Sequence, residues 1–176
     1  MAHAPQTDLN PLRVLASMVL SESAVYGVIM VSGLLVIVAN KSDEPAEVLL
    51  KVLGTAIVFW LAHVYAGAVA HLGDDLDETH STAVKLASAI QHSLGHLWGM
   101  LASAAVPLIT LGASVLGLID QDRAIWGTLW LNVALLAVLG YWGVSRWSPR
   151  LWMRLAGALI TAALGFALVV LKVVIH

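Results

Sequence analysis

The sequence predicts an all-α integral membrane protein, folded as a bundle of five transmembrane helices. Three observations predict this class. Hydrophobic residues make up 60% of the 176 residues and charged residues only 11%, whereas soluble domains carry far more charge. Five apolar segments each reach about the 20 residues that a helix needs to cross a bilayer. Short polar linkers, rich in proline or in charged residues, separate these segments.

The first expected span, residues 14–39, follows an N-terminal tail of residues 1–13 that contains two prolines and no helical periodicity. A signal peptide is disfavoured, because the apolar run continues too far and no small-residue cleavage pattern follows a short apolar core. The linker NKSDEPAE contains a proline and four charged residues, so it predicts a turn outside the bilayer. The second expected span is residues 48–72.

The remaining spans are expected at residues 97–119, 124–144 and 151–175. The third span contains Pro107, which removes a backbone donor and is expected to kink the helix. Tryptophan and tyrosine lie near both ends of the fourth span, as interfacial aromatic belts predict. A linker of residues 73–96 joins the second span to the third.

The basic residues indicate the orientation in the membrane. Arg146, Arg150 and Arg154 cluster in the segment RWSPRLWMR between the last two spans. Clusters of this kind in short loops are typical of the cytoplasmic side. We therefore expect the N-terminus and the linker 73–96 in the cytoplasm and the C-terminus outside, in the plasma membrane of a bacterium.

Rows of small residues at four-residue spacing predict close helix contacts. Such rows let helix backbones approach one another. They serve packing within one subunit or the seam of a homodimer. The rows are Ala62, Ala66 and Ala70 in the second span, and Gly157, Thr161 and Gly165 in the fifth.

Composition also limits the chemistry. The chain has no cysteine, so a metal ion would bind to imidazole, carboxylate or thioether groups. The net charge of −2 argues against a nucleic-acid partner, since phosphate binding needs clustered basic residues. The sequence contains no Ser-His-Asp pattern, phosphate loop or nucleotide motif, and we therefore expect no enzyme activity.

A candidate metal site lies between residues 58 and 96, which hold five of the seven histidines. His63 and His71 are eight residues apart, about 80° around a helix and about 12 Å along its axis. The acidic segment GDDLDETH follows them directly. Imidazole and carboxylate are ligands that suit iron, manganese and zinc. The candidate metal ligands are Glu22, His63, His71, Asp74, Asp75, Asp77, Glu78, His80, His92 and His96.

Each candidate ligand has an alternative interpretation. Glu22 in SESAVYG is either buried at membrane depth, where a carboxylate is usually functional, or hydrated at the headgroups. His92 and His96 have the i,i+4 spacing of two ligands to one metal, but the same spacing occurs on a plain solvated helix face. The segment QHSLGH lacks the glutamate of a metalloprotease motif.

The layout resembles that of the vacuolar iron transporter family. The similar features are five spans, an acidic residue and glycine early in the first span, an ionisable cytoplasmic linker, and a last hairpin reading SPRLWMRLAGALITAALGFALVV. The family has an Asp-Gly pair in its first helix and Met and Glu in its second, where this chain has Glu22 and the two histidines His63 and His71. The resemblance implies a dimeric exporter of ferrous iron or manganese in exchange for protons, with the linker collecting the metal.

Three classes of function follow from these features. A proton-coupled divalent metal transporter explains why histidines and carboxylates occur together, since the same groups bind metal and titrate. A membrane protein that binds b-type haem is an alternative, because histidine pairs on membrane helices can be axial ligands. The third class is a non-catalytic channel or assembly subunit, in which the histidines pack or sense pH.

Overall fold

The computed structural model describes residues 22–39, 44–74, 90–91 and 98–175. Within them the chain forms five helices and no strand, which confirms the all-helical class for this part of the sequence. The helices are α2 (Glu22–Val38), α3 (Pro45–Asp74), α5 (Trp98–Val115), α6 (Gln121–Ser145) and α7 (Leu151–Ile175).

Three of these helices are long and apolar enough to cross a membrane, which indicates a membrane protein. They comprise Pro45–Ala70 within α3, and all of α6 and α7. The apolar parts of α2 and α5, Ser23–Val38 and Gly99–Val115, are shorter. The expected tail 1–13, the start of the first span and most of the linker 73–96 lie outside the described residues.

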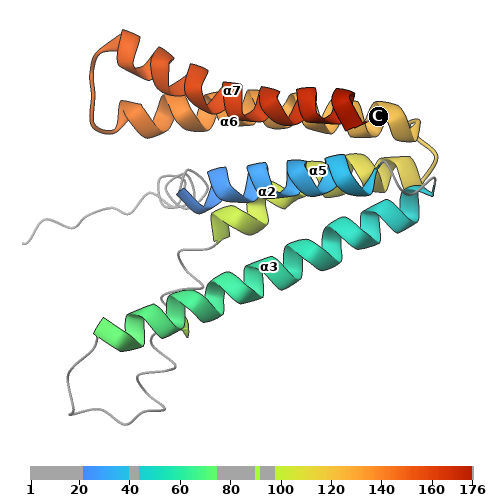
Figure 1. Ribbon diagram of the computed structural model, residues 1–176, viewed down its shortest axis with the longest axis horizontal. Coiled ribbons are helices and arrows are strands. Elements are labelled where there is room, and N and C mark those ends of the chain that lie inside the picture. Colours follow the sequence, from blue (N-terminus) through green and yellow to red (C-terminus); the bar gives the residue numbers. More distant parts are fainter. Residues whose placement is uncertain (1–21, 40–43, 75–89, 92–97, 176) are drawn as a thin grey trace, which may run out of the picture.

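The helices are arranged with α2 and α5 between the α6–α7 hairpin on one side and α3 on the other (Figure 1). Helices α6 and α7 form an antiparallel hairpin, and α2 lies beside α5 below it. Helix α3 packs mainly along α5 and extends away from the other helices toward its C-terminal end. Leu35, Val52, Leu111 and Leu129, one each from α2, α3, α5 and α6, are fully buried where these helices meet.

Helix α3 begins at a proline. Pro45 occupies the first helical position, where its missing N–H would have had no intrahelical partner. Glu44 O accepts from Glu47 N at 3.1 Å and from Val48 N at 3.2 Å, and Glu47 places a carboxylate in the first turn, where the helix dipole favours it. The helix therefore starts three residues before the expected span.

Helix α5 ends earlier than the apolar run does. Gly117 adopts φ +71°, a left-handed conformation that glycine reaches without steric cost. The backbone N–H groups of Gly117 and Leu118 donate to Ser114 O and Ala113 O, both at 2.9 Å. This is a Schellman motif, which closes the helix at Val115 although the expected span continued to residue 119.

The α6–α7 crossing depends on glycine. A Cβ at Gly140 would lie 2.5 Å from Gly157 O, and a Cβ at Gly157 would lie 2.9 Å from Gly140 O. Thr161 Oγ1 donates to Leu136 O across the interface at 2.7 Å. The small residues of α7 therefore make the expected close contact, and they make it with α6 of the same chain.

The small residues of α3 behave differently. Ala62, Ala66 and Ala70 are all exposed, so within the described part of the chain this row is not buried in a close helix contact. A second close approach occurs instead at Gly27 of α2, where a Cβ would collide with Ser103 and lie 3.0 Å from Met100 O of α5. Gly27 therefore lets α2 pack directly on α5.

Candidate functional site

The candidate metal site is described only in part. Six of the ten expected ligands lie outside the described residues: Asp75, Asp77, Glu78, His80, His92 and His96. Glu22 is the first residue of α2, and His71 and Asp74 lie in the last turn of α3. Figure 1 places the N-terminal end of α2 and the C-terminal end of α3 at the same end of the molecule. The part of the chain that is described contains no group of three or more potential metal ligands.

His63 has a defined environment on α3. Its Nδ1 lies 3.0 Å from Phe59 O, and its ring stacks on Phe59 with the centroids 5.9 Å apart. A carbonyl oxygen only accepts hydrogen bonds, so Nδ1 is the donor, and Nε2 of the neutral ring keeps a free lone pair. Histidines that bind metals have this arrangement, with one ring nitrogen on a backbone carbonyl and the other on the metal. The side chain is exposed, on the outer surface of the chain.

A row of buried polar side chains crosses the interior of the bundle. Asn132 of α6, 1% exposed, donates from Nδ2 to Ser32 Oγ of α2 at 2.7 Å, and Ser32 donates on to Val28 O. One turn along α6, the hydroxyl of Thr128 lies 2.5 Å from that of Thr110 of α5. These hydrogen bonds connect α2, α5 and α6 in a region that is otherwise apolar.

The row contains acceptors that the described protein atoms leave unsatisfied. Asn132 Oδ1 and Ser114 Oγ are both buried, and neither has a hydrogen-bond partner among the described residues. A buried amide oxygen without a partner costs free energy, which a water molecule or another donor would recover.

Lys172 adds a charge to the same interior. Lys172 is only 3% exposed, although it lies near the end of the apolar helix α7. Gly165 packs on Val133 and Leu136, so Lys172, about two turns farther along antiparallel α7, reaches the level of Thr128. Asp122 in the first turn of α6 is close enough to interact with it electrostatically. A buried ionisable residue inside an apolar helix is a functional candidate.

Neither Asn132 nor Lys172 was among the expected site residues, although a signal for each exists in the sequence. Asn132 interrupts the apolar run LWLNVALL, and Lys172 interrupts LVVLKVVI. A single polar residue in such a run usually faces the bundle interior. The spacing of histidines and carboxylates predicted a site in the second span and its linker. Asn132 and Lys172 are isolated polar residues in apolar runs, and residue spacing within one helix does not show which other helix they face.

Comparison with known proteins identifies no relative. No protein-family model, curated protein or solved structure matches this chain.

Proposed function

We propose that the chain is a five-span protein of the bacterial plasma membrane, with its N-terminus in the cytoplasm, that moves divalent iron or manganese across the bilayer in exchange for protons. The described helices support the membrane location, and α3 carries the argument for metal. Its sequence places His63 and His71 on neighbouring faces and ends at Asp74, where the acidic segment begins. The layout resemblance to vacuolar iron transporters points to the same class of activity.

The observation that carries this proposal is the hydrogen bond from His63 Nδ1 to Phe59 O. It fixes the neutral ring in the tautomer whose Nε2 binds metal. The acidic segment next to α3 raises the local concentration of cations. Protonation of the imidazoles from the opposite side then releases the ion, because metal and proton compete for the same lone pair.

Metal binding by the purified protein tests this proposal. We expect the protein in detergent to bind Mn²⁺ near neutral pH, and the double variant His63→Ala/His71→Ala to bind it at least tenfold more weakly. Tyr65→Ala is the matched control, since Tyr65 is 72% exposed on the same helix and offers no imidazole. Unchanged Mn²⁺ affinity in the double histidine variant would reject the α3 site.

A second candidate function is that of an assembly subunit, and the outer face of α3 favours it. Ala62 and Ala66 are exposed there, so a helix from another chain can approach closely. A second copy is the occupant that the dimeric family resemblance implies. For this subunit role we expect a dimer by mass measurement in mild detergent, and a monomer after Ala66→Leu. A protein that forms the dimer but binds neither Mn²⁺ nor haem, the latter shown by the absence of a Soret band, would favour this second function.

A further inference from the structure

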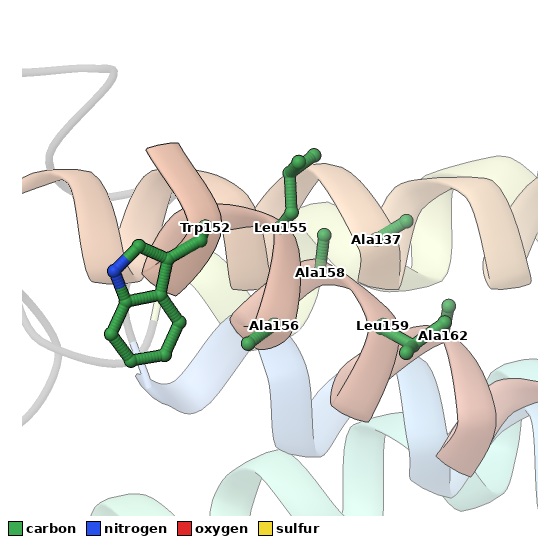
Figure 2. Close-up of a pocket in the computed structure, with 7 residues that line it drawn as sticks. All are labelled: Ala137, Trp152, Leu155, Ala156, Ala158, Leu159 and Ala162. Atoms are coloured by element: carbon green, nitrogen blue, oxygen red, sulfur yellow. The ribbon is translucent and has the colours of Figure 1, made fainter. Parts of the chain in front are cut away.

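The outer side of the α6–α7 hairpin contains an apolar groove that the metal-transport proposal does not involve. Its volume is about 560 Å³. Figure 2 shows alanines along the groove, with Leu155 and Leu159 beside them and the Trp152 indole at one end. Alanine side chains leave open space between larger neighbours, which is why this surface is hollowed.

The length of the groove corresponds to one leaflet of a bilayer. Its residues on α7 run from Trp152 to Ala162, a separation of about 15 Å along the helix axis. The hydrocarbon core of a bilayer is about 30 Å thick, so the groove covers about half of it. A transmembrane helix of a second copy would need a groove of about twice this length.

The end of the groove at Trp152 carries positive charge. Arg146 and Arg150 lie in the connection between α6 and α7 and are both exposed. Arg154 Nε donates to Ser148 O at 3.0 Å, which holds a third guanidinium beside this connection. Because α6 and α7 each have the length of a membrane span, their short connection lies at the membrane surface, at headgroup level.

We propose that this groove and its arginines form a binding site for an anionic phospholipid. One acyl chain occupies the alanine-lined groove, and the phosphate group contacts Arg146 and Arg150. Guanidinium groups bind phosphate through paired, charge-assisted hydrogen bonds. Trp147 and Trp152, both more than 60% exposed, lie at the level where tryptophan prefers the interface. The orientation expected from the same arginines puts the lipid in the cytoplasmic leaflet, whose surface is anionic.

Native mass spectrometry of the full chain tests this site. The protein is transferred from nanodiscs that contain equal amounts of phosphatidylglycerol and phosphatidylcholine. We expect the wild type to retain phosphatidylglycerol at least fivefold over phosphatidylcholine, and Arg146→Gln/Arg150→Gln to lose this preference. Arg123→Gln is the charge control, because Arg123 is exposed at the opposite end of α6.

A second variant tests the groove itself. Ala156→Leu fills the groove and should reduce retention of both lipids, whereas Ala163→Leu, exposed on the same helix but outside the groove, should retain them as the wild type does. Equal retention of the two lipids by the wild type would overturn the proposal. So would an unchanged preference in the double arginine variant, or a dimer that Ala156→Leu dissociates without any loss of lipid.

Discussion

At the scale of single residues, a few polar side chains connect the helices inside the bundle. Asn132 and Ser32 are 100 positions apart in sequence, yet their side chains meet at 2.7 Å in an apolar interior. Water does not compete for such a bond as it does at a surface, but the unfolded chain in the membrane also finds partners, so its net contribution is modest. The bond fixes the register of α2 against α6 more than it adds stability.

We expect a double-mutant cycle of Asn132→Ala and Ser32→Ala to give a coupling free energy of about 0.6–1.7 kcal/mol. Reversible unfolding in mixed detergent micelles measures it. Pairing Ser32→Ala with Ser145→Ala provides the control, since Ser145 donates to Trp142 O within its own helix. That control pair should be additive to within about 0.5 kcal/mol. If the changes in unfolding free energy of Asn132→Ala and Ser32→Ala were also additive, the bond would make no contribution to stability.

At the scale of secondary-structure elements, the α6–α7 hairpin is the most tightly packed unit. Its two helices approach until backbone atoms are in contact at Gly140 and Gly157, and the connection is closed by Ser148, whose Oγ accepts from Arg150 N at 3.3 Å. Close approach brings the Thr161 hydroxyl within reach of Leu136 O. The hairpin therefore combines van der Waals packing with an interhelical hydrogen bond.

Gly140→Ala should destabilise the protein by about 1–3 kcal/mol, the usual cost of overpacking a tight interface. The added methyl group would lie 2.5 Å from Gly157 O. Gly143→Ala, one turn along α6 with open space at the same atom, should be neutral or stabilise the helix by up to about 1 kcal/mol. Thermal unfolding in one detergent compares the two variants. Equal midpoints would show that the hairpin is looser than described.

Most of the helix positions were predictable from the sequence, and the differences have physical causes. Helix α7 has the expected bounds, 151–175, because Pro149 precedes an almost entirely apolar segment that contains no helix-breaking residue. Helix α5 ends four residues early, because Gly117 offers a left-handed closure that hydropathy does not detect. Pro107 lies inside α5, which runs from Trp98 to Val115, so the proline does not end the helix, and the expected kink stays a prediction.

The candidate site was less predictable than the fold. Histidine and carboxylate spacing identifies residues on one helix, such as His63, and cannot show what another helix places beside them. The pairing of Asn132 with Ser32 and the burial of Lys172 depend on the register between helices. Between α6 and α7 this register depends on the close approach at Gly140 and Gly157, and only Gly157 belongs to an expected small-residue row.

At the scale of the whole molecule, charge and aromatic residues divide the protein into two ends. The α6–α7 connection carries arginines and exposed tryptophans, while the α5–α6 connection at the other end has exposed Leu118 next to Asp120 and Asp122. Because α6 is long and apolar enough to cross a membrane, we expect the two connections on opposite sides of the bilayer.

Single cysteines test this orientation cleanly, since the chain has no cysteine of its own. In intact cells, Leu118→Cys should react with a membrane-impermeant maleimide, and Trp147→Cys should react only after the membrane is permeabilised. Reaction of both positions from outside would contradict the expected topology and therefore also the expected cytoplasmic position of the linker 73–96.

Metal flux into proteoliposomes tests the central claim most directly. With an imposed pH gradient, the wild-type protein should move Mn²⁺ or Fe²⁺ across the bilayer, and the flux should reverse when the gradient is reversed. The double variant His63→Ala/His71→Ala should abolish this pH-dependent flux while unfolding at the same temperature as the wild type, and Tyr65→Ala should leave the flux unchanged. Absence of flux by the wild type under either gradient, or undiminished flux in the double histidine variant, would contradict the proposed mechanism.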